Sequence, residues 1–127
     1  MDENLITLKI FSTDYWKGFF NKYIIPKLQA NISRLIIDPN YQKLENLKNL
    51  FVWDEFIHND IVEMLIQIFF PKWIDMLEKW IMHNPDAESV LKWYEGWKKI
   101  LSAKDYIKND RIKAQFAKAL NLISRSF

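Results

Sequence analysis

Histidine and the acidic residues are the side chains in this sequence that could support metal binding or acid–base catalysis. His58 and His83 are its two imidazoles, and neither stands four residues from another histidine or within a His-Glu-x-x-His pattern. A helical zinc site therefore has little support. Acidic pairs such as Asp54-Glu55 stand beside expected turns, where carboxylates favour helix N-termini. The sequence predicts no catalytic residue and no metal site, and an enzyme using these histidines or carboxylates in a polar pocket is a third, disfavoured hypothesis.

Cysteine and glycine are scarce enough to exclude several kinds of site. The chain has no cysteine, so it has no disulfide, thiol nucleophile or thiolate metal cluster. Glycine occurs only at Gly18 and Gly96, too few for glycine-rich phosphate loops or dinucleotide fingerprints. We therefore expect a non-enzymatic protein with no cofactor. Both glycines fall within expected helices beside aromatic residues, so we expect a neighbouring backbone to approach each of them closely.

Length and composition predict one folded domain. The chain has 127 residues, of which 50% are hydrophobic, and this is enough for a substantial core. Its N-terminus is acidic, where a secretory signal would be basic. It has no uncharged apolar run near the roughly 20 residues of a membrane span. We expect a soluble intracellular protein without a membrane segment.

Charge is distributed unevenly along the chain. Residues 1–91 contain nine basic and 13 acidic residues, whereas residues 92–127 contain nine basic and three acidic residues, a net charge of +6. This C-terminal quarter could attract an acidic partner. It could also contact phosphates, and the candidate nucleic-acid contacts are Lys98, Lys99, Lys104 and Arg111. Because the basic residues spread over several helical faces, a solvated basic face is favoured, and an RNA- or DNA-binding module is the alternative.

Apolar residues recur at three- and four-residue steps along almost the whole chain, which predicts an all-α domain of about seven helices. The expected helices cover residues 14–25, 26–37, 39–53, 60–70, 71–81, 87–101 and 110–125. Pro26 and Pro71 are each expected to end one helix and begin the next, because proline lacks the N–H donor and restricts the residue before it. Residues 1–12 are left without assigned structure, as an N-terminal arm.

A possible internal repeat relates two of the helix junctions. The stretch Ile24-Ile25-Pro26-Lys27-Leu28 reappears 45 residues later as Phe69-Phe70-Pro71-Lys72-Trp73. This period is within the range of HEAT-like helical repeats. We expect residues 13–127 to form a HEAT-like repeat or superhelical bundle, and two units are few enough that they should be the end of a larger superhelix. Chance similarity between two aromatic-rich junctions is the alternative.

Aromatic residues near the second junction are candidates for contact with another protein. Trp93, Tyr94 and Trp97 spread over a wider sector of their expected helix than one core usually uses. Tryptophan and tyrosine supply large contact areas at low entropic cost. The candidate partner-contact residues are Lys72, Trp73, Trp93, Tyr94, Trp97 and Lys98.

The same aromatic motifs resemble a known family. FFPKW at residues 69–73 and KWYEGWK at residues 92–98, with Trp16, Pro39, Trp53 and Pro85 at matching positions, are similar to the C-terminal portion of the tuftelin-interacting or septin-interacting protein family. That portion belongs to the GC-rich sequence DNA-binding factor-like domains. The resemblance covers about residues 13–125.

The resemblance implies a non-catalytic scaffold of the late spliceosome, located in the nucleus and acting in spliceosome disassembly and lariat-intron release. The implied partners are spliceosomal proteins or a second factor with the same domain type. Family members help to activate a DEAH-box helicase through a G-patch, and a chain with two glycines cannot contain a G-patch. Helicase contact is therefore not assigned to these residues. The charge pattern does not support the DNA-binding wording of the family name.

Overall fold

The structure is a computed structural model that describes residues 13–127, and every regular element in this part of the chain is helical. The predicted all-α class is confirmed. The elements are α2 (Thr13–Phe19), the π-helical turn η1 (Phe20–Ile24), α3 (Ile25–Ser33), α4 (Glu45–Phe51), α5 (Asp54–Met64), the π-helical turn η2 (Leu65–Phe69), α6 (Phe70–Ile81), α7 (Ala87–Ser102), the 3-10 turn η3 (Tyr106–Lys108) and α8 (Asp110–Ser126). The expected N-terminal arm lies outside the described residues.

The two prolines do not end helices, which corrects the predicted boundaries. The N–H of Ile25 donates to the carbonyl of Phe20, and the N–H of Phe70 donates to the carbonyl of Leu65, five residues back in each case. The wider turn accommodates a residue that cannot donate and whose ring would clash with the carbonyl four residues before it. Each π turn therefore joins its flanking helices. Apart from the 3-10 turn η3, the helical segments within residues 13–127 form five continuous runs, fewer than the seven helices expected.

Residues 34–44 form an irregular loop where two helices were predicted to meet. The helix expected to reach residue 37 ends at Ser33, and the helix expected from residue 39 begins at Glu45. A carboxylate oxygen of Asp38 accepts from the N–H of Asn40 at 2.9 Å, so Asp38 forms a local turn and caps no helix. The Gln42 amide spans the loop, donating to the Ile36 carbonyl at 2.9 Å and accepting from the Asp38 N–H at 3.0 Å.

Helix α5 begins at Asp54, earlier than the start predicted at residue 60. A short turn separates it from α4, and the backbone leaves helical geometry at Ile57, with φ −138° and ψ 39°. This bend lies in the first third of the longest continuous run, residues 54–81. It places the start of α5 at an angle to α6.

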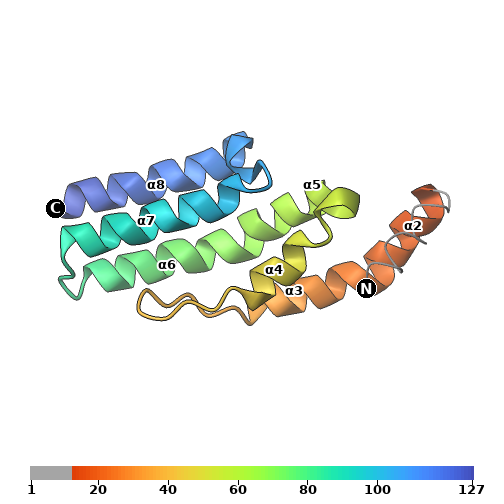
Figure 1. The fold of residues 1–127 in the computed structure, drawn as a ribbon, viewed down its shortest axis with the longest axis horizontal. Coiled ribbons are helices and arrows are strands. Elements are labelled where there is room, and N and C mark those ends of the chain that lie inside the picture. Colours follow the sequence, from red (N-terminus) through yellow and green to blue (C-terminus); the bar gives the residue numbers. More distant parts are fainter. Residues whose placement is uncertain (1–12) are drawn as a thin grey trace.

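Helices α6, α7 and α8 lie side by side and alternate in direction, while α3 packs against α4, α5 and η2 (Figure 1). The largest fully buried side chains are Trp73, Tyr106, Phe69 and Phe70. Phe116 of α8 joins the helices, because its ring lies 5.7 Å from Phe70 and 5.1 Å from Trp73. No helix within residues 13–127 is both long and apolar enough to cross a membrane.

Gly18 and Gly96 lie within α2 and α7, as the sequence predicted. A Cβ atom at either position would meet no other atom within 4 Å. The expected close approach of a neighbouring backbone is therefore wrong at both positions, and nothing in the packing requires glycine there.

Candidate interaction surface

Three of the six predicted partner-contact residues are core residues. Trp73 is 0% exposed, and Tyr94 and Trp97 are each 3% exposed. The reason is the position of α7, which packs on two neighbours at once. Trp93 stacks on Trp73 of α6 with centroids 5.1 Å apart, and Tyr94 meets Phe116 of α8 at 5.8 Å. The wide aromatic sector of α7 is therefore filled by two helices of the same chain.

Lys72 also acts within the molecule. Its ammonium donates to the carbonyls of Ile32 at 3.4 Å, Leu35 at 3.2 Å and Ser33, which lie at and just beyond the end of α3. A positive charge is favourable at a helix C-terminus, where unpaired carbonyls gather partial negative charge. Lys72 therefore joins α6 to α3 and supports the start of the 34–44 loop.

Trp93 is half-buried and contributes to a surface groove. Its ring meets Trp80 edge-on at 5.8 Å, and both rings line a groove that also includes the tip of the 34–44 loop. The indole nitrogen of Trp93 is buried and has no acceptor among the described residues. We call this site the tryptophan groove; its lining residues are Pro39, Asn40, Trp80, Pro85, Asp86, Ser89, Lys92 and Trp93.

The groove depends on two features that place its walls. Asp86 caps α7 by accepting a hydrogen bond from the N–H of Ser89 at 3.0 Å. Hydrogen bonds from the side chain and the backbone of Ser89 hold the pKa of Asp86 below its ordinary value. The 34–44 loop supplies the other wall. Sequence reasoning found Trp93 but missed the loop, because Asp38-Pro39 is also a typical helix start.

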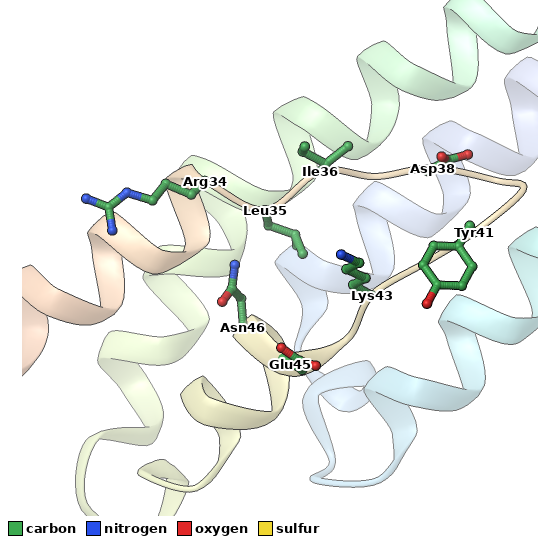
Figure 2. Close-up of a pocket in the computed structure, with 8 residues that line it drawn as sticks. All are labelled: Arg34, Leu35, Ile36, Asp38, Tyr41, Lys43, Glu45 and Asn46. Carbon is green, nitrogen blue, oxygen red and sulfur yellow. The ribbon is translucent and has the colours of Figure 1, made fainter.

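A second groove lies where the same loop meets α3 and α4 (Figure 2). Its side chains come from the end of α3, from both arms of the loop and from the start of α4. Ile36 and Tyr41 line it and are 77% and 71% exposed. The loop thus presents apolar surface on both of its sides.

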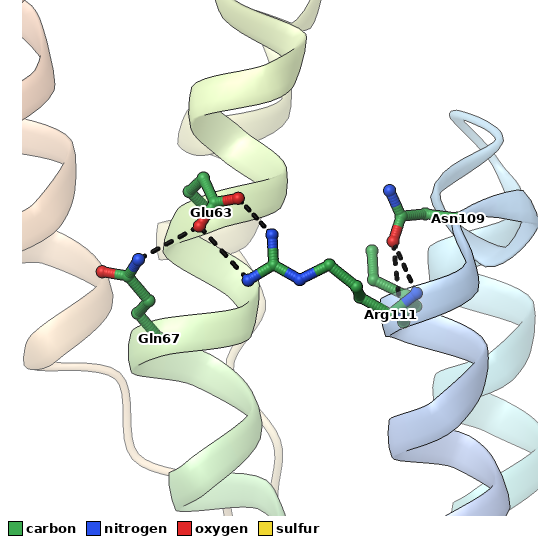
Figure 3. A network of polar contacts seen from close by, with 5 residues as sticks. Glu63, Gln67, Asn109 and Arg111 are labelled. Atoms are coloured by element: carbon green, nitrogen blue, oxygen red, sulfur yellow. Dashed lines mark hydrogen bonds and ion pairs between the residues drawn. The ribbon is translucent and has the colours of Figure 1, made fainter.

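The predicted nucleic-acid contacts differ in their availability. Lys98, Lys99 and Lys104 are exposed, whereas Arg111 reaches across from α8 to Glu63 of α5 (Figure 3). The second guanidinium nitrogen of Arg111 lies 3.4 Å from Glu63, and these bonds lower the pKa of Glu63. Arg111 is therefore already paired within the chain.

The aromatic residues near these basic side chains are not placed to stack on bases. Tyr94, Trp97, Tyr106 and Phe116 are each at most 3% exposed. Single-stranded nucleic acid is commonly bound by exposed rings beside a basic groove. Lys98, Lys99, Lys104 and Arg111 have no such platform beside them among the described residues.

His58 takes part in a cluster that links α5 to η3. The Nδ1 atom of His58 lies 2.7 Å from Asp54, the Tyr106 hydroxyl also donates to Asp54, and the rings of His58 and Tyr106 stack at 5.0 Å. Burial acts to raise the pKa of Asp54, but the hydrogen bonds from Tyr106 and His58 outweigh it and leave the pKa lowered. Burial and the bond to Asp54 raise the pKa of Tyr106. The cluster connects two elements.

His83 lies two residues beyond the end of α6, and its Nδ1 is 2.8 Å from the Lys79 carbonyl. Neither histidine lines the two grooves described above. Among residues 13–127, no group of three or more histidine, aspartate and glutamate side chains is arranged to hold a metal ion.

Comparison with known proteins gives a family match and several relatives. The family model described as GC-rich sequence DNA-binding factor-like protein matches residues 6–77. Septin-interacting protein 1 of Drosophila melanogaster and Tuftelin-interacting protein 11 of Xenopus laevis are each 34% identical to the chain over 119 residues, which is 93% of this chain. Tuftelin-interacting protein 11 of Danio rerio is 31% identical over 118 residues. The chain spans 14% of the length of each of these relatives.

Proposed function

The chain belongs to the GC-rich sequence DNA-binding factor-like protein family, and from that premise we propose that it is a non-catalytic protein–protein interaction module of a pre-mRNA splicing factor. The finer proposal is a nuclear scaffold that acts in spliceosome disassembly and lariat-intron release. Its partners would be spliceosomal proteins or a second factor with the same domain type.

Identity to the relatives supports this proposal most strongly. The matched region covers 92–93% of this chain at 31–34% identity, and the relatives are named for their interactions with other proteins. Because the matched region is a small part of each relative, the activity of a whole splicing factor is not assigned to these residues. Helicase activation through a G-patch would belong to other parts of such a protein.

The tryptophan groove is the surface we propose for partner contact. It combines two tryptophan rings from different helices with two prolines, and such surfaces bury large apolar area with little loss of side-chain freedom. Of the residues predicted from sequence, Trp93 lies in this groove and Lys98 is exposed elsewhere on α7. Lys72, Trp73, Tyr94 and Trp97 support the fold behind it.

Affinity capture from nuclear extract tests the function. The immobilised wild-type chain is expected to recover spliceosomal proteins. A Ser89→Arg variant should recover much less of them, because Ser89 is exposed at the groove and a long charged side chain there obstructs it. Ser126→Arg, at the exposed end of α8, is the matched control and should behave as wild type.

Two results would contradict the proposal. If the folded wild-type chain recovers no spliceosomal protein, the assigned process is wrong. If Ser89→Arg and Ser126→Arg recover the same amounts as wild type, the partner does not use the tryptophan groove. Circular dichroism of each variant checks that its fold is intact.

A further inference from the structure

The outer seam between α7 and α8 is a second surface with defined chemistry. The two helices run in opposite directions side by side (Figure 1), and the contact between Tyr94 and Phe116 fixes their register. One turn from this pair in one direction, Leu91 and Leu120 lie at the same level. One turn in the other direction, Lys98 and Lys113 lie at the same level.

Helical periodicity places these four residues on the same flank. On α7, Trp93 faces α6, and Leu91 and Lys98 lie on the opposite side of the buried stripe. On α8, Arg111 faces α5, and Lys113 and Leu120 lie on the opposite side. We define the α7–α8 seam as Leu91, Glu95, Lys98, Lys113, Ala117 and Leu120, all of which are exposed.

The seam combines apolar surface with a net charge of +1, from Lys98, Lys113 and Glu95, and the Lys98 ammonium also lies 5.8 Å from the centroid of the Tyr94 ring. Leu91 is 42% exposed and Leu120 is 43% exposed. Neither Lys98 nor Lys113 forms an ion pair with the described residues, whereas Lys92, Lys108 and Arg111 nearby each pair with a carboxylate. Exposed leucines beside unpaired lysines complement a surface of opposite charge that also carries an apolar stripe.

We propose that the α7–α8 seam binds an acidic amphipathic helix of a partner protein. This proposal rests on the interaction role proposed above, but it assigns a different surface and a specific partner chemistry. Leu91 and Lys98 are seven residues apart, two helical turns, so a helix lying along the seam meets both levels with side chains of the same heptad spacing. Its apolar residues would pack on Leu91, Ala117 and Leu120, and its carboxylates would face Lys98 and Lys113.

A protein helix is favoured over nucleic acid by the side chains around the two lysines. These are leucine, alanine and Glu95, whose carboxylate repels phosphates, and the nearest rings, those of Tyr94, Trp97, Tyr106 and Phe116, are in the core. Base stacking therefore has no platform at the seam. Leu91, Ala117 and Leu120 instead provide a surface on which the apolar face of a helix can pack.

Fluorescence anisotropy with a defined peptide tests the proposal. The probe is a synthetic helical peptide with a leucine stripe flanked by glutamates, and the same peptide with lysine in place of glutamate is its control. We expect the acidic peptide to bind wild type and the basic peptide not to bind. Lys98→Glu/Lys113→Glu should weaken binding about tenfold or more, and added salt should also weaken it.

Matched variants separate the seam from total charge and from folding. Lys27→Glu/Lys43→Glu changes the net charge equally at exposed positions outside the seam and should retain most of the affinity at physiological salt. Lys98→Arg/Lys113→Arg should also retain it. Leu120→Glu, at an exposed position, tests the apolar part and should weaken binding without affecting the circular dichroism spectrum.

Three outcomes would overturn the proposal: no binding of the acidic peptide, equal binding of the basic peptide, or equal loss of affinity in both double charge variants. Tighter binding of a single-stranded oligonucleotide, lost in Lys98→Glu/Lys113→Glu, would assign the seam to nucleic acid instead. Failure of the peptide together with successful capture of spliceosomal proteins would reject the seam alone. Peptide binding without such capture would reject the splicing role and leave the seam as proposed.

Discussion

Lys72 and Lys27 follow the two helix prolines at corresponding positions, 45 residues apart, but their side chains have different environments. Lys72 is half-buried and donates to the carbonyls at the end of α3, whereas Lys27 is exposed. The same Pro-Lys pair therefore supports tertiary structure at one junction and faces solvent at the other. Sequence alone could not separate them, because the difference depends on which helix end lies opposite.

Replacing Lys72 with methionine tests this difference. Lys72→Met keeps an unbranched apolar chain but removes the charge, so unfolding free energy should fall by about 1–2 kcal/mol. Lys27→Met, at the corresponding exposed position, should change it by less than about 0.5 kcal/mol. Urea denaturation measures both, and equal effects of the two variants would show that Lys72 does not stabilise the end of α3.

The hydroxyl of Tyr106 gives a second prediction at this scale. Tyr106 is fully buried and donates to Asp54, so Tyr106→Phe should destabilise the protein by about 2 kcal/mol through the loss of a bond to a charged acceptor. Tyr41→Phe, at a position 71% exposed, is the control and should have little effect. An unchanged denaturation midpoint for Tyr106→Phe would contradict the role of this bond.

Acid unfolding of the same variant provides a separate check. The pKa of Asp54 is lower in the folded protein than its ordinary value of 3.8, so the unfolded chain binds a proton first as the pH falls. The stability contributed by Asp54 is complete above that value and is lost as the pH falls through the lowered pKa. Tyr106→Phe should lose less stability than wild type between neutral pH and this acidic range, as measured by denaturant titration at each pH.

Helix α7 contains a glycine that its packing does not require. A Cβ at Gly96 would meet no atom within 4 Å, so Gly96→Ala should stabilise the protein by up to about 1 kcal/mol through higher helix propensity. Ala114→Gly, at an exposed position within α8, should have the opposite sign. Thermal denaturation compares the two variants. Destabilisation by Gly96→Ala would mean that another molecule or segment approaches so closely that residue 96 must have no side chain.

The helices from residue 70 onward were predicted closely, and those before it were not. In α6, α7 and α8 the apolar period and the helix bounds agree with those predicted to within one residue. At Pro26 and Pro71 the usual rule that proline separates helices failed, because a π turn provides another way to place the ring. At Asp38 the same side chain could cap a helix or close a turn, and contacts with Gln42 decide between them.

At the scale of the whole molecule, α8 completes the core formed by α6 and α7. Phe116 contacts Phe70, Trp73 and Tyr94, with centroids 5.1–5.8 Å apart. Phe116→Ala should therefore cost about 3–5 kcal/mol of unfolding free energy. Leu120→Ala, one turn away at a position 43% exposed, should cost less than about 1 kcal/mol of unfolding free energy. Equal losses in the two variants, measured by urea denaturation, would show that α8 does not pack on the core through the face that carries Phe116.

The surface was less predictable than the core for a physical reason. Sequence periodicity identifies which residues of one helix share a face, but it does not say how many neighbours that helix has. Tyr94 and Trp97 were assigned to a partner because the aromatic residues of their helix spread over a wider sector than one core usually uses, and α7 fills that sector by contacting both α6 and α8. The tryptophan groove needs a loop whose path depends on Gln42 and Lys72, and a single sequence carries no signal for those contacts.

The π turn before Pro71 has a geometric effect on the longest helical run. Ile61, Leu65, Phe69, Trp73 and Leu77 follow one another at constant intervals of four residues, and each is fully buried. On a regular α-helix of about 3.6 residues per turn, such a series winds gradually around the axis and leaves the core. A turn that holds more residues rotates the series back. The π turn therefore rotates the residues after it relative to those before it. As a result, buried residues at a constant four-residue interval face the same neighbouring helices on both sides of Pro71.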